Sequence, residues 1–178
     1  MCYEATNIRP ALIQDARSIA EVHVESWKTT YRGILPERLL GSLSIEKREQ
    51  FWRDLLTSPQ PNSITLVGCD ASGRVVGFVS GGSERTGKLG CDGVLYAVYL
   101  LQTAQRRGLG TLLVRRFVSE LSERGFASMA VWVLALNPSR KFYEALGGEV
   151  VSEQPIESGG ESFQEIAYGW RDLSRFGG

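Results

Sequence analysis

The segment from residue 94 to residue 125 constrains the fold most, because a strand, a short loop and a helix follow one another there. The run Val94–Leu101 is apolar, β-branched and aromatic, which is typical of a buried strand. From Leu109 onward, apolar residues recur at spacings of three and four, which predicts an amphipathic helix that Gly125 ends as a C-terminal cap. The predicted apolar stripe of this helix consists of Leu109, Leu112, Leu113, Phe117 and Leu121.

The loop between these two elements has the chemistry of an anion-binding site. The first N–H groups of a helix lack partners within the helix, and the helix dipole is positive at that end. Arg106 and Arg107 add positive charge, while Gly108 and Gly110 lack a Cβ that would keep an anion away from the backbone. A pyrophosphate group suits such a loop.

Two other phosphate-binding motifs fit this sequence less well. A dinucleotide-binding motif needs a third glycine, where this chain has Leu113, and an acidic residue about 20 positions beyond the loop, where none occurs. A Walker-type loop nearly occurs at residues 82–88, but Leu89 follows where Mg²⁺ binding needs Ser or Thr. We therefore expect residues 81–93 to form a glycine-rich loop between two strands.

The hexapeptide Gln105-Arg106-Arg107-Gly108-Leu109-Gly110 resembles the Gln/Arg-x-x-Gly-x-Gly/Ala loop of the GCN5-related N-acetyltransferases, the GNAT family. In that family the loop holds the pyrophosphate of acetyl-CoA. The strand ahead of it, here Val98-Tyr99-Leu100, resembles the strand that binds pantetheine. The cofactor-binding residues that this resemblance implies are Val98, Tyr99, Leu100, Gln105, Arg106, Arg107, Gly108, Leu109, Gly110, Thr111 and Asn137.

A second family signature, an Asn ahead of a short helix that carries Phe-Tyr and ends in Leu-Gly, resembles the segment from Asn137 to Gly147. The spacing is one residue shorter than the commonest form, and Gly148 stands where the family usually has Phe. By this resemblance Tyr143 is the catalytic residue that gives a proton to the departing CoA thiolate. From the residues alone, Tyr143 is a boundary aromatic at the edge of a buried helical face formed by Phe142, Ala145 and Leu146.

Acetyl transfer to an amine also needs a group that accepts a proton. An alkyl amine with a pKa of about 10.4 is neutral only to roughly one part in a thousand at pH 7. The candidate carboxylates are Glu25, Asp92 and Glu84, with water as a further alternative, and the sequence does not rank them. His23, the single histidine, lies on the apolar stripe of a predicted helix and is expected to be a packed core residue.

The order of the predicted elements is strand, two or three helices, three strands, helix, strand, helix and two strands. It predicts an α/β fold with one mixed, mostly antiparallel central sheet and helices on both faces. The same order is that of the GNAT acyl-CoA N-acyltransferase fold, so we expect a single domain over residues 1–178. The predicted strands span residues 6–9, 64–69, 75–80, 94–101, 129–136, 150–156 and 163–170, and the predicted helices begin near residues 15, 36, 44, 109 and 138.

Charge and cysteine content limit the partners that we expect. The 20 Lys and Arg residues balance 20 Asp and Glu residues, so no overall field favours a nucleic acid or an anionic membrane. Cys2, Cys69 and Cys91 have no C-x-x-C spacing and imply neither a metal nor a disulfide. Without a signal peptide or an apolar run of about 18 residues, a reduced, cytoplasmic protein is expected.

The leading hypothesis is an acetyl-CoA-dependent N-acetyltransferase that acts on a primary amine of a small molecule, peptide or protein. The alternatives are a non-catalytic acyl-CoA-sensing domain and a nucleotide-binding or nucleic-acid-associated module that uses the Arg cluster. The run Ser26–Pro36 resembles a bacterial-type branch of the GNAT family whose substrates are mostly unassigned, so the acceptor stays open. We expect the segment from Trp27 to Trp52, with Tyr31, to form the acceptor wall, and a homodimer is a family-level expectation.

Overall fold

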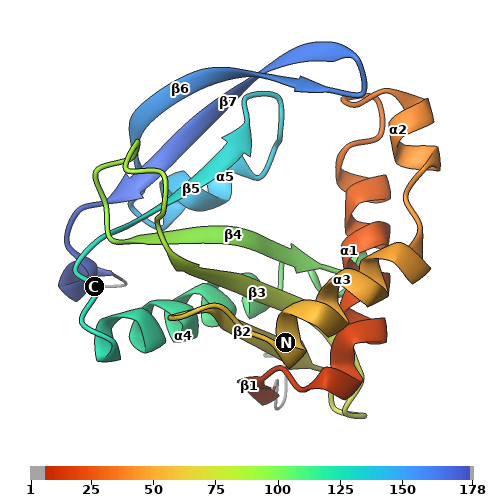
Figure 1. Cartoon of the computed structure of the whole chain (residues 1–178), viewed down its shortest axis with the longest axis horizontal. Coiled ribbons are helices and arrows are strands. Elements are labelled where there is room, and N and C mark those ends of the chain that lie inside the picture. Colours follow the sequence, from red (N-terminus) through yellow and green to blue (C-terminus); the bar gives the residue numbers. More distant parts are fainter. Residues whose placement is uncertain (1–6, 177–178) are drawn as a thin grey trace.

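The structure, a computed structural model, describes residues 7–176 (Figure 1). Its seven strands are β1 (Asn7–Pro10), β2 (Ile64–Cys69), β3 (Val75–Ser83), β4 (Gly93–Leu100), β5 (Met129–Leu134), β6 (Glu149–Ser158) and β7 (Glu161–Trp170). They form one sheet in the order β1-β2-β3-β4-β5-β7-β6. All neighbours are antiparallel except β4 and β5, which are parallel. The predicted fold class is therefore confirmed.

Helices cover both faces of this sheet (Figure 1). The helices are α1 (Ala16–Thr30), α2 (Glu37–Gly41), α3 (Ile45–Thr57), α4 (Leu109–Glu123) and α5 (Arg140–Ala145). On one face α1 and α3 pack on β2 and β3 through a core that includes Ile19, Trp52 and Phe78. On the other face α4 and α5 pack on the central strands, so the two faces of β4 meet two different sets of helices.

The strands β4 and β5 separate soon after they pair. Their pairing covers only Gly93–Leu95 of β4 and Met129–Val131 of β5. At that point a bulge leaves Tyr96 without a partner on β3, because Ser80 pairs with Ala97 while Gly81 pairs with Leu95. The second half of β4 is thus bonded to β3 on one side and open on the side that faces β5.

The helix α4 packs through four leucine and phenylalanine side chains that are at most 1% exposed, namely Leu109, Leu113, Phe117 and Leu121. The prediction that Leu112 belongs to this stripe is wrong, because Leu112 is 47% exposed. The buried face is centred on Leu113 and Phe117, and Val114 and Val118 complete it instead. Phe117 lies against β3 at Gly81, where a Cβ would stand 2.5 Å from its ring.

Several predicted element ends shift by a few residues. β3 continues to Ser83, since Gly81 and Gly82 still pair with β4, so the connecting loop is shorter than predicted and spans residues 84–92. β5 ends at Leu134, and α5 begins at Arg140 rather than at Pro138. The predicted start of the first strand at residue 6 lies outside the described residues.

The last hairpin reaches across the sheet to the N-terminal helices (Figure 1). Its turn consists of Gly159 and Gly160, both in the left-handed region with φ of +59° and +77°, as a two-residue hairpin turn requires. Arg38 of α2 donates to the Gly159 carbonyl and pairs with Glu161 at 3.3 Å. Segments from opposite ends of the chain therefore close one side of the molecule above β4 and β5.

Candidate active site

The predicted pyrophosphate loop joins β4 to α4 through two left-handed residues. Arg106 has φ +60° and Gly108 has φ +87°, and Gly108 is the residue at which α4 begins. A Cβ on Gly108 would meet no atom within 4 Å, so the backbone conformation and not the available space requires glycine here. The first N–H that finds an acceptor within α4 is that of Leu112, which donates to the Gly108 carbonyl at 3.0 Å. The N–H groups of the first turn are left for a ligand.

Gly110, in that first turn, is under no such constraint, because its φ is not positive. A Cβ there would stand 3.5 Å from the ring of Phe142, which is ordinary van der Waals contact. An alanine would therefore fit at Gly110, while Gly108 admits no other residue without strain. Two glycines that look alike in the sequence thus differ in how strictly the backbone needs them.

The open half of β4 offers backbone groups to the gap between β4 and β5. The Leu101 N–H donates to the Val76 carbonyl of β3 at 2.9 Å. Since bonding alternates along an antiparallel strand, the N–H and C=O of Val98 and the N–H of Leu100 point toward the gap. The Leu100 carbonyl accepts hydrogen bonds from Ser26 Oγ at 2.9 Å and from Gln105 Nε2 at 3.1 Å. Helix α1 and the loop are both fastened to the end of β4.

Tyr143 of α5 reaches toward the same gap. Its side chain is buried against Tyr168 and Trp170, with ring centroids 6.2 and 6.5 Å away. No described residue forms a hydrogen bond with the Tyr143 hydroxyl. Within residues 7–176, the only side-chain polar atom that is fully enclosed and lacks a partner is Trp27 Nε1, so the Tyr143 oxygen is not fully enclosed. Burial raises the pKa of Tyr143, and the nearby Tyr99 adds to this rise, so the phenol stays protonated.

Three tyrosines converge where β4 and β5 part. Burial raises the pKa of Tyr31, and Tyr99 and Tyr143 add to this rise. The Tyr31 hydroxyl therefore lies within electrostatic range of the other two. Tyr31 is held by Asn137, whose Nδ2 donates to the Tyr31 hydroxyl at 3.0 Å while its Oδ1 accepts from the Ser139 N–H at 2.8 Å. Both ends of the Asn137 amide are engaged within the chain, and they tie the end of α1 to the start of α5.

Four rings form what we call the acceptor face, after the role that we propose for it: His23, Trp27 and Tyr31 from α1 and its end, and Tyr99 from β4. His23 stacks on Tyr99 with ring centroids 5.1 Å apart, and Trp27 contacts Tyr31 at 5.0 Å. Trp52 Nε1 donates to His23 Nδ1 at 3.3 Å. Burial, with a smaller effect of the Arg48 charge, lowers the pKa of His23 to about 3, so the ring is neutral. The predicted core role of His23 is confirmed.

Comparison with known proteins fits this geometry. The family described as FR47-like protein matches residues 85–155, which include β4, the loop and α5. Over 167 residues, or 94% of each chain, the protein is 41% identical to the uncharacterized N-acetyltransferase YuaI of Bacillus subtilis (strain 168). The chain belongs to the GNAT family of N-acetyltransferases. It is thus an enzyme of that family.

Two further GNAT relatives come from Thermoplasma acidophilum. A spermidine N(1)-acetyltransferase is 34% identical over 74 residues, which are 40% of this chain and 46% of that protein. The crystal structure of the PaiA N-acetyltransferase in complex with coenzyme A has a TM-score of 0.73 and 22% identity. The match covers 91% of this chain and 98% of that one. At this identity the second comparison supports the GNAT fold.

Within the GNAT fold, the surroundings of Tyr143 differ from the sequence-based expectation. The helical pattern predicted Tyr143 at the edge of a buried face that included Ala145, whereas Ala145 is exposed and Tyr143 is the most buried residue of α5. The reason is Trp170, whose ring lies where a Cβ on Gly148 would come within 2.8 Å. The glycine that departs from the GNAT pattern makes room for Trp170, and Trp170 then packs against Tyr143.

Two of the three carboxylates considered as general bases stabilise turns. Asp92 Oδ2 accepts from the N–H groups of Ala127 and Ser128 at 2.8 and 3.2 Å, and these bonds lower its pKa. Glu84 accepts from the N–H groups of Thr86 and Gly87 within its own loop at 2.8 and 2.6 Å. Glu25 is exposed on α1. Asp92 also precedes the paired half of β4, at the end away from Leu100.

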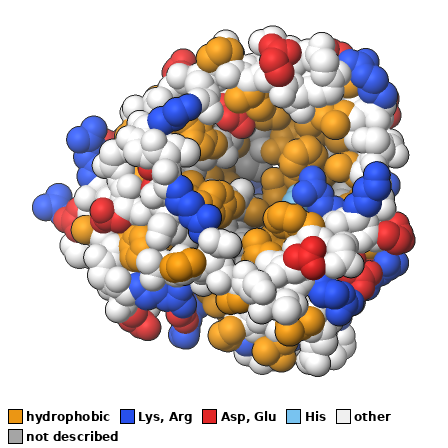
Figure 2. All heavy atoms as spheres, viewed as in Figure 1, with side chains coloured by type: hydrophobic (Ala, Val, Ile, Leu, Met, Phe, Trp, Pro, Cys, Tyr) orange, Lys and Arg blue, Asp and Glu red, His pale blue; other side chains and the backbone are white. Residues whose placement is uncertain are grey.

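One face of the molecule is hollowed. Figure 2 shows that the walls of this hollow are largely hydrophobic and that Lys or Arg side chains lie close to its rim. Within residues 7–176, no group of three His, Cys, Asp or Glu side chains could hold a metal ion. None of the described helices is long and apolar enough to cross a membrane.

Sequence reasoning missed the residues that fasten the two sides together. Ser26 holds the end of β4, and its signal is a small polar residue on a helix whose buried face is apolar apart from His23. Gly148 was seen only as a departure from the GNAT pattern. No sequence signal pairs it with Trp170, which lies 22 residues away.

Proposed function

We propose that this GNAT protein transfers the acetyl group of acetyl-CoA to a primary amine of a small molecule or peptide. The observation that carries the proposal is the open half of β4, whose free backbone groups lie directly ahead of a loop with unpaired N–H groups. A ligand with amides at one end and a pyrophosphate at the other matches both features. Acetyl-CoA has that form.

In this proposal the cofactor binds through two backbone surfaces. The pyrophosphate accepts hydrogen bonds from the first turn of α4, at Leu109, Gly110 and Thr111, with Arg106 and Arg107 adding charge. The pantetheine amides pair with Val98 and Leu100 much as a further strand would. The N–H groups on this edge also suit the thioester oxygen, where negative charge develops during transfer.

Tyr143 is the proposed catalytic residue. The amine nitrogen attacks the thioester carbon, the C–S bond breaks, and the sulfur leaves with the electron pair and takes a proton from the Tyr143 hydroxyl. Burial raises the pKa of Tyr143, so the phenol holds its proton until the thiolate, a much stronger base than the thioester sulfur, forms beside it.

The amine proton leaves through water in this proposal. Asp92 and Glu84 are engaged in turns, and His23 with a pKa of about 3 is too weak a base at neutral pH. Tyr143 regains its proton from the same water. The free thiols of Cys69 and Cys91 are consistent with the reducing cytoplasm, which we propose as the location. A homodimer stays a prediction.

The test is a thermal-shift panel with acetyl-CoA, CoA, ATP and NAD, followed by thiol release on a set of amines. We expect acetyl-CoA and CoA to raise the melting temperature and ATP and NAD not to, because only the CoA forms also fit the β4 edge. Release of CoA that depends on an added amine supports acetyl transfer to that amine. Binding of acetyl-CoA without release on any amine favours the acyl-CoA-sensing alternative.

A further inference from the structure

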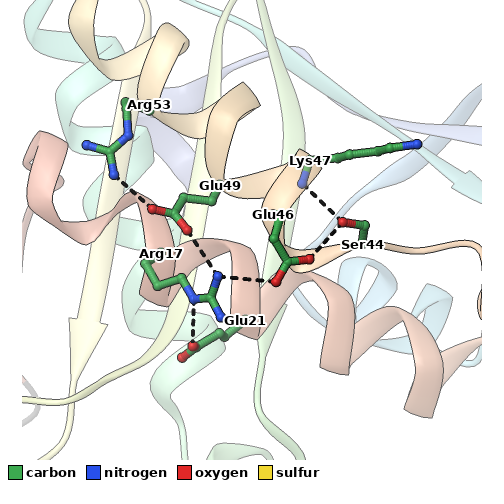
Figure 3. Close-up of polar contacts among 7 residues, drawn as sticks. All are labelled: Arg17, Glu21, Ser44, Glu46, Lys47, Glu49 and Arg53. Atoms are coloured by element: carbon green, nitrogen blue, oxygen red, sulfur yellow. Dashed lines mark hydrogen bonds and ion pairs between the residues drawn. The ribbon is translucent and has the colours of Figure 1, made fainter.

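Two arginines at the contact of α1 and α3 differ sharply in their partners. Arg17 of α1 pairs with Glu21, Glu46 and Glu49 at 3.1, 3.5 and 3.1 Å, and Glu49 also pairs with Arg53 at 2.8 Å (Figure 3). These residues form a network in which each carboxylate already has a cation. The network is exposed and belongs to the outer side of the helix pair.

Arg48 of α3 takes no part in that network. It is half-buried, and no hydrogen bond or ion pair reaches its guanidinium from any described residue. The carboxylates nearest to it along α3, Glu46 and Glu49, are held by Arg17. A half-buried cation without an anion is unfavourable in the free protein, and a bound anion would relieve that cost.

Arg48 also lies beside the acceptor face. It precedes Trp52 by four residues, so both share one side of α3, and Trp52 is the residue that donates to His23. Burial raises the pKa of Tyr99 against the lowering effects of Trp27, Tyr31 and the Arg48 charge. The same charge acts on His23. The guanidinium is therefore within electrostatic range of the two stacked rings that form the floor of the acceptor face.

The acceptor face carries no negative charge of its own. Its four members are His23, which is neutral, and three aromatic residues. Among the described residues, Arg48 is the only ion whose charge acts on the pKa of His23 and of Tyr99, two of these four side chains. A polyamine acceptor would meet a single positive charge and no carboxylate, while an acceptor with an anionic group would find its counterion.

We propose that the amine acceptor also carries a carboxylate, as an amino acid does, and that Arg48 binds this carboxylate. The proposal rests on the proposed N-acetyltransferase function and narrows its acceptor. A guanidinium holds a carboxylate through two parallel hydrogen bonds, which orients the ligand as well as attracting it. The apolar part of the acceptor lies along Trp27 and Tyr99, and its amine lies toward the open half of β4.

The test compares acceptors that differ only in the carboxylate. The pairs are phenylalanine with phenethylamine, leucine with 3-methylbutylamine, and 4-aminobutanoate with propylamine, and spermidine is assayed beside them. A charge-assisted bond contributes about 1.5–3 kcal/mol, so we expect kcat/KM for at least one carboxylate-bearing member to exceed that of its partner by about 10-fold or more. Higher kcat/KM for every plain amine, or for spermidine, overturns the proposal.

The variant Arg48→Gln tests whether Arg48 is the residue that binds the carboxylate. It should raise KM for the preferred amino acid by about 10-fold or more and leave KM for the plain amine and for acetyl-CoA nearly unchanged. Arg17→Gln is the matched control, since Arg17 is an arginine of the same helix pair whose carboxylates lie within the protein, and it should leave the selectivity intact. An equal loss for both members of a pair in Arg48→Gln contradicts the assignment.

Calorimetry separates this proposal from the one on which it rests. If acetyl-CoA binds but none of the acceptors is acetylated or bound, the carboxylate proposal is overturned and the cofactor site stands. If acetyl-CoA does not bind, the proposed function fails, and titration of phenylalanine and leucine still decides the role of Arg48. If the parent protein binds these amino acids and Arg48→Gln does not, the role of Arg48 is supported. If the parent protein shows no heat of binding, that role is overturned.

Discussion

The proposed cofactor half and the proposed acceptor half of the molecule are built by different means. The cofactor half uses backbone: the φ of Gly108, the free N–H groups of α4 and the open edge of β4. The acceptor half uses side chains from distant segments, such as Tyr31 held by Asn137 and the acceptor face packed between α1 and β4. A ligand shared by a whole family can be bound by backbone alone, while a particular acceptor must be selected by side chains.

The largest effect is expected where the two halves meet. Tyr143→Phe removes only the hydroxyl, so the packing against Tyr168 and Trp170 is kept and acetyl-CoA affinity should not change. The transfer step should slow by roughly 10²-fold or more, the range for loss of a general acid. Single-turnover rates and calorimetry on the same preparation measure the two quantities. A variant as fast as the parent in single turnover removes Tyr143 from the mechanism.

A break confined to the cofactor half comes from Gly108→Val. Valine at φ +87° is strained and displaces the N–H groups at the start of α4. Acetyl-CoA affinity should fall about 30-fold, equivalent to about 2 kcal/mol. Gly110→Ala is the control, since its Cβ makes an ordinary contact with Phe142, and it should bind within a few-fold of the parent. Equal losses in both variants would mean that the loop conformation is not what binds the cofactor.

The acceptor half should show a pH dependence of stability that the cofactor half lacks. The pKa of His23 in the folded protein is about 3, below the usual histidine value of 6.5, so protons bind the unfolded chain first and stability falls as the pH falls below 6.5. Between pH 6.5 and pH 5 the loss should be about 2 kcal/mol. Urea unfolding measures it, and His23→Asn, which keeps an acceptor for Trp52, should abolish the slope. If the pH dependence of stability survives in His23→Asn, other titratable groups cause it.

Tyr31→Phe probes the tie between the halves. It leaves the Asn137 amide N–H without its partner and should cost about 1–2 kcal/mol of unfolding free energy. KM for the acceptor should rise several-fold, while KM for acetyl-CoA stays nearly constant. Steady-state kinetics with each substrate varied in turn separates the two. A change in KM for acetyl-CoA alone would place Tyr31 in the cofactor half.

The smallest effect is expected for Arg106→Ala. An exposed charge contributes about 1 kcal/mol or less to the binding of an anion, and added salt screens it. Affinity for acetyl-CoA should therefore fall less than 5-fold, by an amount that shrinks in high salt. Titrations at two ionic strengths measure both effects. A salt-independent loss as large as that of Gly108→Val would mean that the side chain, and not the backbone, holds the pyrophosphate.

The same division explains how far the sequence alone could be interpreted. The fold order and the strand–loop–helix unit follow from periodicity and from glycines with a conformational role, such as Gly108, Gly125 and Gly147, all of which have positive φ. Periodicity failed at Leu112 and Tyr143, because the orientation of a helix depends on what it packs against. The roles of Ser26 and Gly148 depend on partners far along the chain, which no local pattern contains.

Amide hydrogen exchange with and without acetyl-CoA tests the central claim most directly, because the claim concerns backbone groups. The account predicts slower exchange at Val98, at Leu100 and in residues 109–111 when acetyl-CoA is bound, with little change in α3. Protection centred on residues 84–92, or none along β4 and the start of α4, would contradict it.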